Sequence, residues 1–167
     1  QSLQVMAQLA SERINKELQR YESITQEVGS IARLSNADIL MGEKEDLINQ
    51  RVKTYGFQAG GIIDANGVGM FDHKTYSSQD YYKSAMQGET VVTEPMVDEK
   101  TGDLTIVVAA PLWQNGIPNS QPIGVVYFIP QQNFLNDIVS SIKISDNGGA
   151  YLINNQGTVI AHQNLAL

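Results

Sequence analysis

Cysteine is absent from this 167-residue chain, and so is any apolar run of the roughly 20 residues that a membrane-spanning helix needs. The lack of thiols excludes disulfides, thiolate metal sites and cysteine nucleophiles. Basic residues are scarce as well, because 11 Lys and Arg stand against 18 Asp and Glu, which gives a net charge of −7. A nucleic-acid-binding surface is basic, so we expect no nucleic-acid partner.

Hydrophobic residues form 42% of the chain and charged residues 17%, which is typical of a folded domain. The length allows one domain with a sizeable core, or one small domain and a fragment. From Leu3 to about Leu34, apolar residues recur at steps of three and four, which predicts one amphipathic helix. Two interpretations stay open for it: a core helix packed on a sheet, or a longer stalk that leads toward a membrane anchor or a helical dimer partner.

After residue 56 the apolar period changes from that of a helix to that of a strand. The strands expected from this pattern are Phe57–Phe71, Glu89–Val97, Leu104–Leu112 and Ile123–Ile129. A shorter helix is expected between Ser35 and Tyr55, where Asp46–Lys53 has the helical pattern and Gly56 ends it. Another is expected over Asp80–Gln87, closed by Gly88, and a third over Phe134–Ile142. The fold class predicted is α+β: a long N-terminal helix with a five-stranded antiparallel sheet and flanking helices.

A hairpin is predicted around the turn Asp64-Ala65-Asn66-Gly67, because Asn and Gly tolerate the positive φ of hairpin turns. Its sequence is echoed near the C-terminus, where Ile153 and Gly157 match Ile63 and Gly67. The echo predicts a second hairpin over 150–161, at the opening of a second copy of the module.

Residues with catalytic potential are few. Ser77, His73 and Asp72 could in principle form a triad, but the chain has no Gly-x-Ser-x-Gly motif. Asp64 with Asp72 and His73 could be read as metal ligands, but no second histidine lies at ligand spacing. We therefore expect no enzymatic activity, no metal and no cofactor.

Tyrosines are concentrated instead. Tyr76, Tyr81 and Tyr82 fall within seven residues, beside Gln79. A tyrosine offers a flat apolar face with a hydroxyl at its end, which suits a small polar ligand. The alternative is that these rings only cover the sheet.

The order of several motifs along the chain resembles a double Cache sensor domain, a PAS-like family. These motifs are the hairpin Ile62–Gly67, Asp80–Ala85, Thr93–Asp98, Ile106–Pro111, Ile123–Val126 and Asn147–Asn154. The resemblance implies two PAS-like lobes along a stalk helix. Residues 1–34 would form the helix, 35–143 the membrane-distal lobe, and 144–167 the incomplete start of a membrane-proximal lobe.

The resemblance also implies a function. Such domains are extracytoplasmic ligand-binding parts of bacterial membrane receptors, here most closely a methyl-accepting chemotaxis protein, or else a sensor histidine kinase or diguanylate cyclase. The expected partner is a small molecule, and a homodimer through the N-terminal helix is possible. A pilin-like structural or interaction subunit is the alternative, since it also joins a long helix to an antiparallel sheet.

The site residues follow from the same resemblance. Amino-acid-binding members have an Arg-x-Trp-Tyr motif that holds the carboxylate, a Pro-Tyr-x-Asp segment and a strand Asp. The ligand-binding residues expected here are Gln79, Tyr81, Tyr82, Met96, Asp98, Tyr127 and Ile129. Because Gln79 replaces the arginine, a charge-assisted grip of roughly 1.5–3 kcal/mol is lost. We therefore expect a ligand other than a standard α-amino acid.

Overall fold

The computed structural model describes residues 3–98, 102–138, 140, 152–153 and 159–161. The chain divides into two compact units. One comprises Gln1–Tyr21, Thr93–Ile106 and Gln131–Leu167, and the other comprises Glu22–Val92 and Val107–Pro130. We call them the terminal unit and the sheet unit, and the sheet unit carries most of the candidate site.

The first helix, α1 (Leu3–Gly29), ends earlier than the predicted Leu34. Gly29 lies so close to the sheet that an added Cβ would be 2.1 Å from the carbonyl oxygen of Pro111. The chain turns after this contact and continues as the short α2 (Ala32–Ser35). Contact between the first helix and the sheet, which the sequence predicted, is confirmed at this point.

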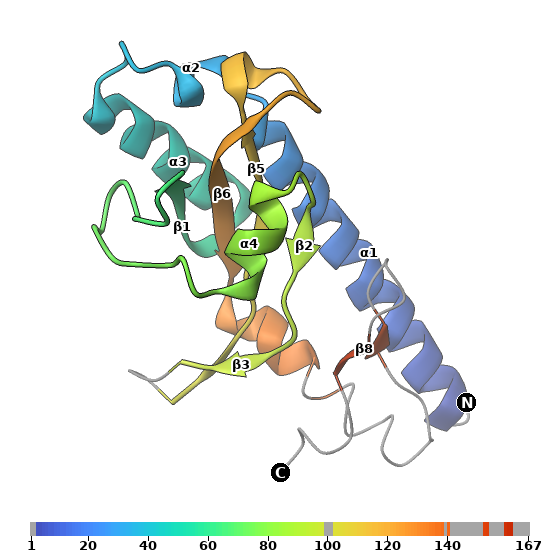
Figure 1. Cartoon of the computed structure of the whole chain (residues 1–167). Coiled ribbons are helices and arrows are strands. Elements are labelled where there is room, and N and C mark those ends of the chain that lie inside the picture. The colour runs from blue at the N-terminus through green and yellow to red at the C-terminus, as the bar shows by residue number, and fades with distance from the viewer. Residues whose placement is uncertain (1–2, 99–101, 139, 141–151, 154–158, 162–167) are drawn as a thin grey trace. The chain divides into compact units, whose positions relative to one another are not determined.

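The next helix, α3 (Met41–Tyr55), ends where the sequence predicted. Gly56 adopts φ 73°, and its N–H donates to the carbonyl of Val52. A left-handed residue of this kind closes many helices, and glycine adopts it without a Cβ clash. The buried side chain of Ile48 faces the interior from α3, which lies behind the sheet in Figure 1.

The main sheet is antiparallel throughout, with the strand order β1-β6-β5-β2. Its strands are β1 (Phe57–Asp64), β6 (Pro122–Pro130), β5 (Val108–Trp113) and β2 (Val91–Val92). The predicted α+β fold with an antiparallel sheet is thus confirmed, but this sheet has four strands instead of five.

One predicted strand is missing from this sheet, and another is shortened. After the turn 64–67, the chain forms only the isolated bridges Ile63–Gly69 and Val68–Thr75. The second half of the predicted segment Phe57–Phe71 is therefore not a strand of the sheet. The predicted strand Glu89–Val97 breaks before Pro95, whose nitrogen cannot donate to a ladder. Its second half, β3 (Met96–Val97), instead pairs with β4 (Leu104–Thr105) in the terminal unit.

The first turn also differs in detail. Gly67 has a positive φ of 83°, but Asn66 does not, contrary to the expectation for both. The carboxylate of Asp64 accepts the N–H groups of Asn66, at 2.8 Å, and Val68, at 3.0 Å. Because these bonds fix the turn locally, one positive-φ residue is enough.

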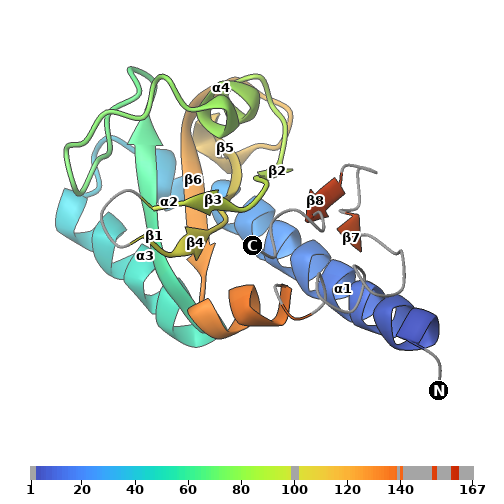
Figure 2. The ribbon, with the colours of Figure 1, turned by 90° about the horizontal axis from the view of Figure 1, so that it is seen from below.

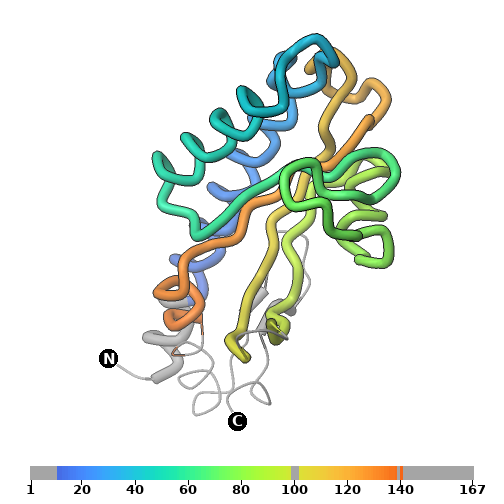
Figure 3. The backbone as a smooth tube through the Cα atoms, turned by 90° about the vertical axis from the view of Figure 1, so that its left-hand side faces the viewer, coloured from blue at the N-terminus to red at the C-terminus, as the bar shows by residue number. Residues whose placement is uncertain are grey.

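The two faces of β6 differ in burial. Gly124, Val126 and Phe128 are buried, and Phe57 stacks on Phe128 with ring centroids 4.7 Å apart. On the opposite face Val125 is buried, while Tyr127 and Ile129 are half-buried. Figure 3 shows α3 on one side of the sheet, and the loop 65–79 with α4 (Asp80–Met86) on the other.

In the terminal unit, α1 packs on a helix described at 132–138 and 140, where Phe134–Ile142 was predicted. Tyr21 meets Phe134 edge to face, with centroids 5.3 Å apart. The strands β7 (Leu152–Ile153) and β8 (Val159–Ala161), seen in Figure 2, pair antiparallel and confirm the second hairpin in its paired part. The rest of that hairpin lies outside the described residues. In the part that the structure describes, no helix is long and apolar enough to cross a membrane.

Candidate ligand-binding site

The floor of the candidate site is the half-buried face of β6, with Tyr127 at its centre. Opposite Tyr127 on the neighbouring strands lie Gly61 and Ala109. A Cβ added to Gly61 would be 2.7 Å from the Tyr127 hydroxyl oxygen. The ring therefore lies across β1 because glycine stands there, and burial raises its pKa.

Helix α4 covers one side of this floor. Tyr81 and Tyr82 are 8% and 7% exposed, and the Tyr82 hydroxyl donates to the carbonyl of Asp64 at 2.9 Å. Burial raises the pKa of Tyr81 to about 12, with further contributions from Tyr127 and Asp72. Tyr127 and Asp72 thus act electrostatically on the Tyr81 hydroxyl.

The loop before α4 contributes a hydrogen-bonded pair. Tyr76 donates to the carboxylate of Asp72, whose other oxygen accepts the backbone N–H of Lys74 at 3.0 Å. Burial raises the pKa of Asp72, but these two bonds and the Lys74 charge outweigh it and hold the pKa below its usual value. Burial, and next the bond to Asp72, raise the pKa of Tyr76.

Tyr76 then reaches Tyr127. Their ring centroids are 5.8 Å apart and their hydroxyl oxygens 3.5 Å apart. A hollow of about 90 Å³ adjoins Tyr127 and Asp72 at the edge of β1. It is also lined by Glu45, Asn49, Gly60, Gly61, Ile62 and Phe71. Of the tyrosines described above, only Tyr127 lines this hollow, together with the carboxylate of Asp72, which hydrogen bonds hold in place.

Five of the seven predicted site residues lie in the sheet unit. Tyr81, Tyr82, Tyr127 and Ile129 lie on α4 or on the half-buried face of β6, and Gln79 is exposed just before α4. The other two, Met96 and Asp98, belong to the terminal unit. Met96 lies on β3, and the Asp98 N–H donates to the carbonyl of Asp103 at 2.8 Å across a turn.

Asp72 and Tyr76 were not among the predicted binding residues. From the sequence, Asp72 was a candidate only for a triad or a metal site, and Tyr76 was one of several tyrosines. A usable signal was present, because an acid and a tyrosine four residues apart follow the first hairpin. Within the described residues, no three His, Asp or Glu side chains converge as a metal site.

Comparison with known proteins places this geometry in context. The family model for the Cache domain matches residues 1–166. The methyl-accepting chemotaxis protein McpG of Pseudomonas putida is 28% identical over 130 residues, which is 77% of this chain and 20% of that protein. The chain spans a quarter or less of the length of the curated relatives it matches.

Solved structures agree in fold. The ligand-binding domain of the Campylobacter jejuni chemoreceptor Tlp3, in complex with 4-methylisoleucine, has a TM-score of 0.68 at 12% identity, covering 98% of this chain and 70% of that one. The ligand-binding domain of the Pseudomonas aeruginosa amino acid chemoreceptor PctC, in complex with GABA, has a TM-score of 0.65 at 18% identity, covering 98% and 75%. With the family match over nearly its whole length, the chain belongs to the Cache domain family.

Proposed function

We propose that this chain is the extracytoplasmic ligand-binding part of a bacterial membrane receptor, with a methyl-accepting chemotaxis protein as the favoured type. The observation that carries the proposal is the half-buried tyrosine face of β6 beneath α4 and the loop 65–79. A small molecule binds on this face, and no reaction follows. The similarity to chemotaxis receptors supports this function over that of a pilin-like subunit.

The ligand is not a standard α-amino acid. Gln79 stands where amino-acid-binding members have an arginine, and a neutral amide cannot supply the bidentate, charge-assisted grip on a carboxylate. Tlp3 and PctC bind 4-methylisoleucine and GABA in the compared structures. The contributions of Met96 and Asp98 stay predictions from the family resemblance.

Signalling follows from a population shift. A ligand biases a receptor only by the difference between its affinities for two conformations. We propose that the two conformations differ at α4 and the loop 65–79, and that residues 1–34 transmit the change in their populations toward the membrane. The lobe boundaries at 35–143 and 144–167, the membrane anchor and a homodimer through the first helix belong to the same proposal.

A thermal-shift screen of small amines, organic acids, hydroxylated metabolites and unmodified amino acids tests the site. A ligand that binds only the folded state stabilises it by roughly 2.7 kcal/mol at 100 times its Kd. We expect hits mostly outside the amino acids, reduced in Tyr81→Phe and Tyr127→Phe. The matched control is Tyr55→Phe, because Tyr55 ends α3 on the other side of the sheet. Hits that shift all three variants equally would place the site elsewhere.

A further inference from the structure

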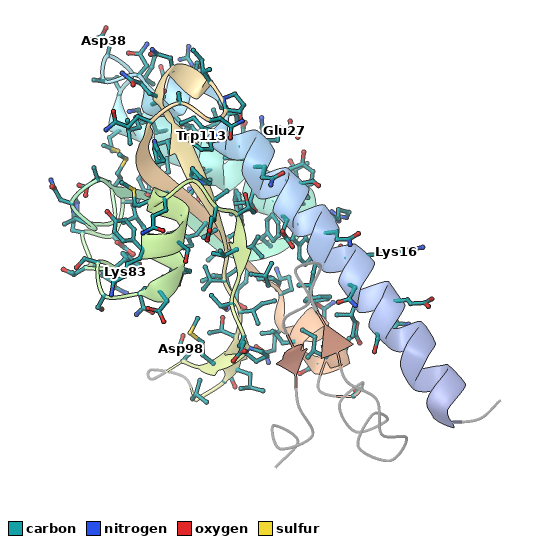
Figure 4. The ribbon with its side chains drawn as sticks, turned by 45° about the vertical axis from the view of Figure 1, so that its right-hand side comes forward. Lys16, Glu27, Asp38, Lys83, Asp98 and Trp113 are labelled. Atoms are coloured by element: carbon teal, nitrogen blue, oxygen red, sulfur yellow. The ribbon has the colours of Figure 1, made fainter. Side chains whose placement is uncertain are left out.

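A groove of about 480 Å³ lies along the last turns of α1, within the sheet unit. Its walls come from α1, from the link between α4 and β2, and from the hairpin between β5 and β6. Figure 4 shows Glu27 on this part of α1 and Trp113 near the same end of the helix. The groove shares no lining residue with the hollow beside Tyr127. Small-molecule sites commonly have roughly 300–1,000 Å³, so its size is sufficient for one.

The walls of the groove are fixed to one another. A Cβ added to Gly116 in the hairpin would be 2.5 Å from the carbonyl oxygen of Ser30, so the hairpin packs directly on the end of α1. Gln26 donates from Nε2 to the hydroxyl oxygen of Thr90 at 3.0 Å, which joins α1 to the segment before β2. The groove is therefore formed before any ligand enters it.

The polar side chains of the groove offer donors and acceptors together. Among the described residues, Gln26 uses one of its two amide N–H groups on Thr90, which leaves the other N–H and the amide oxygen. Ser30 donates its proton to the backbone carbonyl of Gln26 at 3.1 Å, so its oxygen is left as an acceptor. Asn119 adds a second amide. A hydroxyl both donates and accepts, so it suits this surface better than an ammonium, which only donates, or a carboxylate, which only accepts.

Trp113 gives the groove an apolar base. Its side chain is 8% exposed, and a Cβ added to Gly88 would be 3.4 Å from the edge of its ring. Its indole N–H donates to no residue that the structure describes, although a buried tryptophan usually has a partner for this group. An oxygen atom of a ligand in the groove is the acceptor that we expect, with C–H groups of the ligand against the ring.

Charge narrows the class of ligand further. Among the described residues that line the groove, Glu27 alone is ionisable, and it repels an anion. We propose that the groove is a second binding site, which takes a neutral polyhydroxyl compound of the size of a monosaccharide. Its hydroxyls would bond to Gln26, Ser30 and Asn119, and its C–H groups would lie on Trp113. The inference goes beyond the proposed function, because it uses neither α4 nor the tyrosine face of β6.

Trp113 is the single tryptophan of the chain, so its fluorescence reports on this groove. The neutral probes are D-glucose, D-galactose, D-ribose and myo-inositol. D-glucuronate serves as an anion, and tetrahydropyran as a six-membered ring without hydroxyls. We expect at least one neutral probe to change the fluorescence saturably, with NMR titration as a second measurement of its Kd. It should bind about tenfold more tightly than D-glucuronate and tetrahydropyran, as one or two additional hydrogen bonds would give.

Two variants each remove one amide from the groove. Asn119 has a φ of 65°, which glycine also adopts, so Asn119→Gly keeps the backbone of the turn. We expect Asn119→Gly and Gln26→Met each to weaken the bound neutral probe about fivefold. Gln50→Met is the matched control, because it makes the same change at an exposed position of α3 and should have no effect. Glu27→Gln should strengthen D-glucuronate binding several-fold, because it removes the repulsion.

Three outcomes overturn the inference. The first is that none of the four neutral probes changes the fluorescence or the NMR spectrum. The second is that D-glucuronate or tetrahydropyran binds as tightly as the best neutral probe. The third is a neutral probe whose affinity is unchanged in both amide variants, or falls only in Tyr127→Phe, which would place it outside the groove. The proposed function is tested by Tyr81→Phe and Tyr127→Phe, so it stands or falls separately.

Discussion

At the scale of single residues, glycines decide where the backbone and the site side chains fit. Gly29 allows α1 to reach the sheet, and Gly61 leaves room for the Tyr127 ring. A hydrophobic pattern does not reveal either contact, because glycine enters such a pattern only as a weak helix or strand former. The reason for each lies in a neighbour that is distant in sequence, so the sequence could not predict it.

Gly29→Ala should destabilise the fold, because the new Cβ would meet the Pro111 carbonyl and force the helix from the sheet. We expect the free energy of unfolding, measured by urea denaturation, to fall by about 1–3 kcal/mol. Gly42→Ala is the matched control: it lies within α3 with nothing within 4 Å of its added Cβ, and should raise stability by about 0.5–1 kcal/mol. Equal effects of the two changes would contradict the close contact.

Asp72 should make stability depend on acid pH. Its pKa is lower in the folded than in the unfolded chain, so its contribution is present above the unfolded value of about 3.9 and is lost as pH falls through the folded value. We expect the stability difference between wild type and Asp72→Asn to shrink from about pH 6 to about pH 3. Tyr76→Phe keeps the carboxylate but removes one hydrogen bond, so it should show a smaller pH dependence. A difference that does not vary with pH would refute the assignment.

At the scale of elements, Tyr82 ties α4 to the end of β1. Removing its hydroxyl leaves the buried ring in place and the Asp64 carbonyl without this donor. Tyr82→Phe should therefore lower the free energy of unfolding by about 0.5–1.5 kcal/mol and speed hydrogen exchange at the α4 amides. Unchanged α4 exchange would show that the bond does not hold the helix.

The elements themselves were largely predictable from sequence. The periodic apolar patterns indicated α3, α4 and β6. Gly56 and Gly88 marked the ends of α3 and α4. The length of the strands was predicted less well. Pro95 within Glu89–Val97 was a signal for a break, whereas nothing in Leu104–Thr105 and Val108 marks the break between β4 and β5, where the chain passes from one compact unit to the other. Local propensity carries no information on such a change of partner.

The site was predictable in part. The family motif pointed to α4 and β6, and the structure places α4 on the side of the sheet where Tyr127 lies, but the binding role of these residues stays a prediction. Asp72 and Tyr76 come from a loop, where no periodicity operates, and their relation to Tyr127 depends on how that loop folds over the sheet. Spacing alone could not distinguish a binding role from a solvated turn.

At the scale of the whole molecule, five tyrosines among the described residues have raised pKa values, with burial as the largest cause. The folded protein therefore keeps protons that the unfolded chain releases above about pH 10, so stability is full below that pH and falls as pH rises toward the values of about 12 for Tyr21 and Tyr81. We expect tyrosinate absorbance and loss of circular dichroism to rise together in one cooperative step. Gradual ionisation of all tyrosines near pH 10 in a folded protein would contradict this.

The strand order has a consequence for synthesis on the ribosome. In the sheet, β1 pairs with β6, and Phe57 lies opposite Pro130. The first strand of this sheet to be synthesised therefore cannot pair until the last one has been synthesised. Until then Ile62 and Ile63, which are fully buried in the finished fold, have no partner strand. Such non-local pairing slows folding and exposes apolar segments to aggregation. The nascent chain is therefore most vulnerable between the emergence of β1 and that of β6, which makes this interval the one where a chaperone would matter most.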